Sequence, residues 1–524
     1  MADKKEISLS LNKLVKSSII VFVGLILSKL LTYVYRVVIA RTYGPESYGV
    51  YSLALVCVGW FIAFATLGLS EGSLRYFVYY REKKQKESSK YLMKMSLTFL
   101  TISSILSAII LYIFSDNIAI GLFNSPELAY LLKWFSLGIP LSILVLPFVM
   151  LMRANENISA YTIIYSVVQN ISKVFLVSVI ILAGMSFETA IVGSYLASLL
   201  IVLIVAYLYI RIKVSEMLLA PKINKEDKKS IRQEVFRYSA PMLFYSILVS
   251  VLYWIDSMSL GYYKTPFEVG LYNAAVPIAL LLSLAPELFS QLFYPLITKY
   301  YTLKKSEVVR QLVKQVSKWI FAINIPIGVM IILYPEVILS ILFGNEYIGA
   351  SRALQILALS NVYASVAFIS TSFISASGRS KTVLINMLIA SFVNVILNSL
   401  LVPKQYILGL DNSDGLIGAA IATLISITLL NTLFIIQTKK IIGAVPFRMK
   451  MISIMLSSII PIFLLIKFSN KFSSGEHGLI FLILVSLSFA LIYGINLIIF
   501  RAFDRYDIKI FRDIKSSLKR RING

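Results

Sequence analysis

Apolar stretches of about 20 residues recur along the chain and are separated by short polar connections. A helix of about 20 residues is long enough to cross the roughly 30 Å of hydrocarbon in a bilayer. The pattern therefore predicts an all-α polytopic membrane protein with about 14 transmembrane helices. The predicted spans are 17–40, 48–70, 91–114, 132–152, 161–183, 188–210, 236–260, 271–296, 317–334, 351–376, 383–402, 416–437, 451–468 and 479–500.

Composition and charge agree with this picture and orient the chain. The 524 residues are 58% hydrophobic and 15% charged, which is outside the range of soluble domains. The net charge is +24, and about 40 of the 50 Lys and Arg residues fall in alternate connections. This positive-inside pattern predicts that both termini lie in the cytoplasm and the protein in the cell membrane. It also explains the positive charge without a nucleic-acid partner.

The N-terminus and the rare residue types exclude several classes of site. Segment 1–16 is polar and lacks a small-residue cleavage site, so we expect the first helix to be retained. A single Cys57 excludes an internal disulfide, and with one His477 it cannot form a Cys/His metal site. The sequence thus predicts neither a metal centre nor a bound cofactor.

An internal repeat divides the chain. YGPESYGVYSLALV (43–56) matches KTPFEVGLYNAAVP (264–277), with Gly49 over Gly270 at an offset of 221 residues. Two copies of a six-helix unit enter the membrane in the same direction, which predicts two lobes around a central cleft suited to alternating access. The predicted parts are an N-terminal segment (1–16), an N-lobe (17–210), a cytoplasmic linker (211–235), a C-lobe (236–437), an appended helix pair (451–500) and a basic cytoplasmic tail (501–524).

Four short segments carry a family likeness: IARTYGPESYGVYSLA, ATLGLSEGSLRYF, WIDSMSLGYYKTPFEVGLYNAA and ILFGNEY. With them the chain resembles the polysaccharide biosynthesis and oligosaccharide flippases of the multidrug/oligosaccharidyl-lipid/polysaccharide exporter superfamily over nearly its whole length. The resemblance implies a two-lobed fold of 12 core helices that carries a polyprenyl- or dolichyl-diphosphate-linked oligosaccharide to the outer leaflet for cell-surface polysaccharide biosynthesis. It also implies a basic cavity, contact with membrane lipids, glycan-assembly proteins as partners, and coupling to an ion gradient, H⁺ or Na⁺, or to membrane potential.

Two cations interrupt the first predicted span. Lys29 and Arg36 are seven residues apart and so lie on nearly one helix face, about 10 Å apart along the axis, with Thr32 and Tyr33 between them. An ionised Lys or Arg at the bilayer centre costs about 2.5 to 3.5 kcal/mol on insertion scales, so such residues usually face a cavity or an opposite charge. We hypothesise that they bind the diphosphate. Alternatively, Arg36 snorkels to the outer headgroups.

Asp256 is the only carboxylate in the seventh predicted span, and the repeat places it opposite Tyr35 and Arg36. It would pair with Arg36 when the outer side closes, or take up a proton or sodium ion as the coupling site, or simply lie near solvent at the helix end. Lys173 and Glu287 either line the cleft or pair between helices.

Other features carry several interpretations. Asn394 and Asn398 could bind sugar hydroxyls or join helices. Pro277, Pro286 and Pro295 favour bends in the eighth span, whether these move during gating or not.

Three alternative functions differ in the chemistry that they require. A cation-coupled multidrug antiporter of the same fold would need carboxylates in the N-lobe, and spans one to six contain none beyond Glu188, the first residue of the sixth span. A flippase for a lipid II-type cell-wall precursor is a further alternative, because the sequence does not identify the glycan. A membrane polymerase or glycosyltransferase needs a catalytic carboxylate cluster, commonly in a sizeable loop. The predicted loops are short and carry no such cluster, so we expect no enzyme activity and no catalytic residues.

Overall fold

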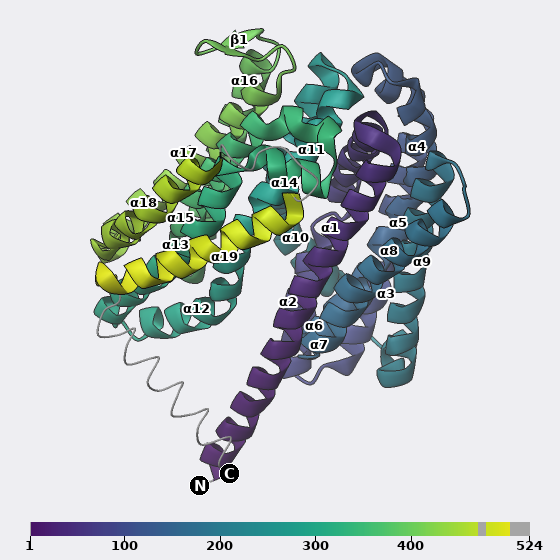
Figure 1. The fold of residues 1–524 in the computed structure, drawn as a ribbon. Helices are drawn as coiled ribbons and strands as arrows, with labels where there is room; N and C mark the ends of the chain where they lie inside the picture. Colours follow the sequence, from purple (N-terminus) through teal and green to yellow (C-terminus); the bar gives the residue numbers. More distant parts are fainter. Residues whose placement is uncertain (1, 470–477, 503–524) are drawn as a thin grey trace. The chain divides into compact units, whose positions relative to one another are not determined.

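The computed structural model describes residues 2–469 and 478–502 and is almost entirely helical (Figure 1). Its contacts divide the chain into two compact units, Met1–Asn273 with Asn398–Gly415 and Ala274–Leu397 with Leu416–Gly524. The seventh span belongs by its contacts to the first unit, and the lobe boundaries drawn from the repeat stay a prediction. His477 and residues 503–524 of the predicted basic tail lie outside the described residues.

The first unit contains the first seven predicted spans. Its helices are α1 (Ala2–Ala65), α2 (Leu69–Glu82), α3 (Lys86–Phe123), α4 (Pro126–Ser136), α5 (Gly138–Leu144), α6 (Leu146–Ala154), α7 (Ile158–Tyr161), the π-helix η1 (Thr162–Val168), α8 (Gln169–Leu182), α9 (Phe187–Lys213), the 3-10 helix η2 (Ser215–Leu218) and α10 (Lys225–Tyr263). Helix α11 (Pro266–Ala279) begins in this unit and ends in the second.

The second unit contains most of the remaining helices. They are η3 (Leu280–Ser283), α12 (Leu284–Thr302), α13 (Ser306–Leu333), α14 (Pro335–Leu342), η4 (Asn345–Ala350), α15 (Ser351–Ala376), α17 (Leu416–Ile442), α18 (Lys450–Ser469) and α19 (Gly478–Ile499), together with the part of α16 (Ser380–Leu401) that precedes Asn398.

The predicted spans are confirmed as helices. Within the described residues, 13 helices are long and apolar enough to cross a membrane. One of them, Val23–Ala65, covers most of two predicted spans, because α1 bends at Gly44, whose φ of 79° suits glycine. Pro45 begins the second stretch, where a missing N–H costs no helical hydrogen bond.

Three spans are interrupted along their length. The fourth is split into α4, α5 and α6, the fifth begins with the π-helix η1, and the eighth changes to the 3-10 helix η3 between Pro277 and Pro286. Proline removes a backbone donor and disfavours a continuous α-helix, which accounts for the change of helix type in the eighth span.

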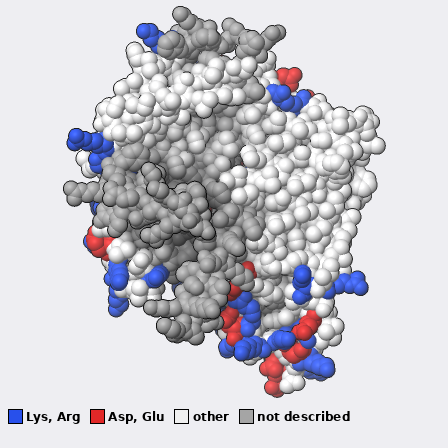
Figure 2. All heavy atoms as spheres, turned by 60° about the horizontal axis from the view of Figure 1, so that its bottom comes forward, with Lys and Arg blue, Asp and Glu red and all other residues white. Residues whose placement is uncertain are grey.

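The surface is that of a protein surrounded by hydrocarbon. Large apolar side chains are exposed on the helices, among them Ile113 (62%), Phe175 (64%) and Phe392 (65%). On the face drawn in Figure 2, charged side chains gather in groups separated by broad uncharged surface. The chain is a multi-pass membrane protein.

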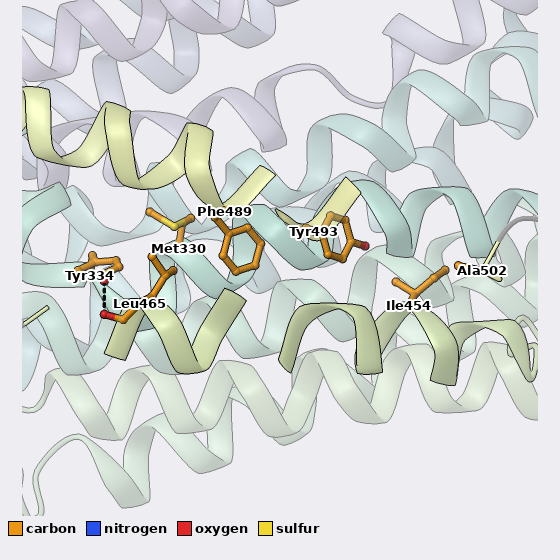
Figure 3. Close-up of a cluster of buried hydrophobic side chains, with 7 residues drawn as sticks. All are labelled: Met330, Tyr334, Ile454, Leu465, Phe489, Tyr493 and Ala502. Carbon is orange, nitrogen blue, oxygen red and sulfur yellow. Dashed lines mark hydrogen bonds between the residues drawn. The ribbon is translucent and has the colours of Figure 1, made fainter. Parts of the chain in front are cut away.

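The appended helices α18 and α19 share a core with α13. Met330, Tyr334, Leu465, Phe489 and Tyr493 pack in one buried cluster (Figure 3). The Tyr334 hydroxyl donates to the main-chain oxygen of Leu465 at 3.1 Å, and that of Tyr493 donates to Ala322 at 3.0 Å. Both predicted appended spans are therefore integral to the second unit.

One connection departs from the all-α prediction. Strands β1 (Tyr406–Ile407) and β2 (Leu410–Asp411) pair antiparallel as a short hairpin between α16 and α17. The buried Asn412 side chain donates to the main-chain oxygens of Leu401 and Lys404 and so fixes the hairpin to the end of α16. Two residues per strand are too few to show a period-2 pattern in the sequence.

Candidate substrate-binding site

The two predicted cations of the first span lie on one continuous helical stretch. Lys29 and Arg36 both precede the bend of α1 at Gly44, and both are half-buried. Their spacing of nearly two turns puts them on almost the same face. Between them, the Thr32 hydroxyl donates to the main-chain oxygen of Ser28 at 2.9 Å, and Tyr33 is half-buried.

Arg36 is held against the protein by a buried tyrosine. Its guanidinium donates a hydrogen bond to the hydroxyl of Tyr48, which is 0% exposed and lies just past the bend. The Tyr48 hydroxyl in turn donates to the main-chain oxygen of Asn273 at 3.1 Å. An arginine fixed in this way is preorganised, which does not favour the interpretation that it snorkels to headgroups.

Lys173 joins Arg36 from α8. Its ammonium lies 5.5 Å from the ring centroid of Tyr195, and it is within electrostatic range of Arg36. Asn170, one turn earlier, donates to the hydroxyl of Ser28 at 2.9 Å and ties α8 to α1 next to Lys29. The structure thus brings Arg36 and Lys173 together and places Lys29 on the same pair of packed helices.

A cluster of buried aromatic side chains packs next to these cations. The ring of Tyr35 meets that of Tyr51 edge-on at 6.1 Å, and Phe135 stacks on Tyr195 at 4.3 Å. Tyr51 also contacts Phe135 at 6.4 Å, which joins the two pairs. Packed rings offer a π-face to a cation and have few rotamers to lose, so they hold neighbouring charges in place.

The repeat gave a signal for one of these residues. Tyr51 is in register with Tyr272, so its presence in both copies could have marked it as part of the site. Tyr48 and Tyr195 have no such signal, because their spacing does not distinguish them from ordinary buried tyrosines.

Asp256 is buried and accepts hydrogen bonds from two neutral side chains. It is 8% exposed in α10, and its oxygens accept from the Tyr272 hydroxyl at 2.7 Å and from the Asn398 amide at 2.9 Å. The neighbouring Ser257 accepts from the Asn273 amide at 3.0 Å. Asn398 therefore joins α16 to α10, the helix-joining role that was one of its two predicted interpretations.

The repeat register explains this arrangement. Tyr35 and Tyr51 form a hydrogen-bonded pair in the first copy, and Asp256 and Tyr272, at an offset of 221 residues, form the equivalent pair in the second. The second copy thus carries a carboxylate where the first carries a phenol. Arg36 is matched by the neutral Ser257. The two copies share the same helical arrangement at these positions. The charged residues that differ between them, Arg36 and Asp256, are predicted site residues.

Tyr272 and Asn273, which are neighbours in α11, link Arg36 to Asp256. Arg36 reaches Asn273 through Tyr48, and Asp256 accepts directly from Tyr272. The predicted pairing of Arg36 with Asp256 stays a hypothesis for another conformation, because here the Asp256 oxygens accept from Tyr272 and Asn398.

Two further charges lie in the second unit. Glu287, on α12, is half-buried and accepts from the Ser283 hydroxyl at 3.0 Å. Lys318, at the start of the ninth predicted span, is only 2% exposed within α13. Lysine at a span boundary gives no sequence signal of burial. Within the described part of the chain, no group of three or more His, Cys, Asp or Glu side chains could hold a metal ion.

Comparisons with known proteins identify the family. The polysaccharide biosynthesis protein family matches residues 14–301, more than half of the chain, and the MatE family matches residues 241–400. The "Putative O-antigen transporter" of Shigella flexneri is 25% identical over 403 residues, which are 75% of this chain and 89% of that protein.

Solved structures show the fold. The lipid II flippase MurJ in an inward closed conformation matches 92% of this chain and 99% of its own, with a TM-score of 0.70 and 17% identity. An inward-facing multidrug resistance transporter of the MATE family matches 79% of this chain and 96% of its own, with a TM-score of 0.66 and 15% identity. The chain therefore belongs to the polysaccharide biosynthesis protein family and has the fold of MOP superfamily transporters.

Proposed function

We propose that this transporter is a flippase that moves a polyprenyl- or dolichyl-diphosphate-linked oligosaccharide to the outer leaflet of the cell membrane. The observation that carries the proposal is that Arg36, held by Tyr48, lies within electrostatic range of Lys173, whose ammonium lies over the ring of the buried Tyr195. Two cations that lie close together repel each other and are stabilised by a polyanion. A diphosphate supplies such an anion, and arginine binds its oxygens through a planar fork.

The proposed cycle needs no covalent chemistry. Arg36, Lys173 and Lys29 bind the diphosphate, the glycan occupies the cavity, and the polyprenyl tail stays in lipid. A membrane potential negative inside contributes about 2.3 kcal/mol per charge per 100 mV, which favours outward movement of the anionic head. Both termini would lie in the cytoplasm, and glycan-assembly proteins would supply and receive the substrate.

Two other transport functions remain as alternatives. One is a multidrug antiporter, since the MatE family matches residues 241–400 and a multidrug resistance transporter shares the fold, and the other is a flippase for lipid II, since MurJ shares the fold. A cation would be repelled by Arg36 and Lys173, so the antiporter is the weaker candidate. Lipid II differs from other lipid-linked glycans in its sugars and peptide, and only a substrate comparison separates the two.

A proteoliposome assay tests the proposal. A fluorophore on the glycan of a polyprenyl-diphosphate oligosaccharide is bleached by dithionite only when it is in the outer leaflet. We expect the protein to accelerate bleaching of the inner pool for this lipid and not for the same glycan on a neutral lipid. Exchange of an organic cation with no movement of the lipid would contradict the proposal, and movement of lipid II alone would reassign the substrate.

Asp256 is the proposed coupling residue. A buried carboxylate that accepts from a tyrosine and an amide can take up a proton or bind sodium and so respond to an ion gradient. We expect Asp256→Asn to remove the dependence of transport on a proton or sodium gradient, with at least a tenfold loss of gradient-driven rate. The measurement is the transport rate in proteoliposomes with and without each imposed gradient.

Asp116→Asn is the matched control. Asp116, on α3, forms an ion pair with Lys133 at 2.9 Å, and its side chain is 55% exposed. An exposed pair of this kind contributes little to stability. Its substitution should leave gradient dependence unchanged. Equal gradient dependence in Asp256→Asn and wild type would show that coupling, if any, resides elsewhere.

A further inference from the structure

A groove in the second unit is lined by residues that do not belong to the proposed transport site. It has a volume of about 740 Å³, in the range of ligand pockets, and lies between the start of α13 and the connection from α17 to α18. Figure 1 shows α13, α17 and α18 in the same part of the fold, and α13 contacts both of the others.

The lining combines apolar side chains with three cations. Leu312 and Trp319 come from α13, and Phe447 and Met449 come from the connection, where they are 45% and 80% exposed. Among the described residues that line the groove there is no Asp or Glu, and the cations are Lys314, Arg448 and Lys450. Such a surface is complementary to a ligand with an anionic head and an apolar body.

Hydrogen bonds hold both ends of the connection to fixed points. Arg310 on α13 donates to the main-chain oxygen of Ile442 at the end of α17, and it also pairs with Glu307 at 3.2 Å. Arg448 donates to the side-chain oxygen of Gln315. Lys450 donates to the main-chain oxygen of Arg501 at 2.6 Å. The groove is therefore preformed, which lowers the entropic cost of binding.

The groove lies at the part of α13 that we expect at the membrane interface. Helix α13 is a candidate membrane span, and the groove lies at its first turns, which carry the basic residues that the positive-inside pattern assigns to the cytoplasmic side. Tryptophan prefers this depth, and exposed apolar side chains next to cations are typical of segments that enter the headgroup region.

We propose that this groove binds an anionic glycerophospholipid of the cytoplasmic leaflet. Its phosphate contacts Lys314, Arg448 and Lys450, and its acyl chains lie along Leu312, Trp319 and Phe447. Anionic lipids are attracted to clustered Lys and Arg at a membrane surface. The proposal does not depend on the transported substrate, because all the groove residues belong to the second unit and none is among the diphosphate ligands proposed above.

Brominated lipids give a direct test. Bromine on the acyl chains quenches nearby tryptophan fluorescence, and Trp319 is one of four tryptophans in the chain. We expect brominated phosphatidylglycerol to quench the reconstituted protein more than brominated phosphatidylcholine does, and Trp319→Phe to abolish the difference. Equal quenching by the two lipids, or a difference that persists in Trp319→Phe, would overturn the proposal.

Charge substitutions identify the headgroup contacts. Lys314→Gln with Arg448→Gln should weaken phosphatidylglycerol binding, measured as retained lipid by native mass spectrometry, by about fivefold per charge removed. Lys439→Gln with Lys440→Gln is the matched control, because these exposed residues near the end of α17 carry the same charge and do not line the groove. The control should retain lipid as the wild type does.

Two results of this comparison would contradict the proposal. Equal loss in both double variants would mean that net charge alone attracts the lipid. Preferential retention of a polyprenyl diphosphate over phosphatidylglycerol, lost only with Lys314 and Arg448, would assign the groove to the transported lipid. If Lys314→Gln with Arg448→Gln does not fold, the Trp319 quenching comparison decides on its own.

Discussion

Replacing Arg36 by Gln is expected to reduce transport of a diphosphate-linked oligosaccharide on the order of 10²-fold. The guanidinium is held by Tyr48 and lies within electrostatic range of Lys173, so its loss removes both a charge and a fixed fork of donors. In the proposed complex Arg36 forms a charge pair with the diphosphate of the substrate. Removing one partner of a desolvated, hydrogen-bonded charge pair typically costs about 2 to 5 kcal/mol, and a value near the lower end suffices for this loss of transport. Initial transport rates in proteoliposomes, normalised to the inserted protein, provide the measurement.

Two companion variants separate charge from geometry. Arg36→Lys keeps the charge but loses the planar fork and should recover only part of the activity. Lys133→Gln removes a cation that pairs with Asp116 and should transport as the wild type does. If Arg36→Gln transports as well as Lys133→Gln, Arg36 is not a substrate ligand.

Replacing Gly49 by Ala is expected to destabilise the protein markedly. A Cβ on Gly49 would overlap the carbonyl oxygen of Pro266, and a Cβ on Gly270 would overlap that of Pro45. The contact is reciprocal and joins the positions that the internal repeat places in register. Because the overlap is with main chain, no side-chain rotation relieves it, and the helices must separate. Overpacking of this kind costs typically about 1 to 3 kcal/mol.

The thermal unfolding midpoint in detergent measures this effect. Gly49→Ala and Gly270→Ala should each lower the midpoint by several degrees, and the double variant should lose less than the sum because both act on one contact. Gly121→Ala is the control, since no atom lies within 4 Å of its added Cβ. A Gly49→Ala midpoint equal to that of Gly121→Ala would show that the close approach does not exist in the native protein.

The helices and the repeat could be predicted because both depend on patterns local to the chain. Apolar runs of membrane length mark the spans, and the 221-residue offset pairs Gly49 with Gly270. Sequence similarity alone does not tell whether paired positions touch. That these two glycines meet across a pseudo-symmetric contact emerges only from the fold.

The charged residues of the candidate site could be predicted from the sequence. Embedded charges are costly, so Lys29, Arg36, Lys173 and Asp256 stand out in apolar stretches. Their partners do not stand out. Asn398 reaches Asp256 from 142 residues away, and nothing in its own segment indicates that contact.

Uncharged residues of the site are still harder to find from sequence. Tyr48 and Tyr195 are two of 31 tyrosines, and only the packing of α1, α8 and α9 shows that they position cations. Interruptions of helices follow the same rule. The prolines of the eighth span predict a bend, but the π-helix η1 contains neither Pro nor Gly and gives no such signal.

Binding to purified protein tests the account most directly. A synthetic polyprenyl-diphosphate oligosaccharide and an organic cation are titrated separately into wild type and Lys29→Ala, with normal folding of the variant verified first. The account predicts that the wild type binds the lipid-linked anion and not the cation, and that Lys29→Ala loses most of this affinity. Binding of the cation alone would contradict it and assign the protein to drug export, and undiminished anion binding by Lys29→Ala would remove Lys29 from the site.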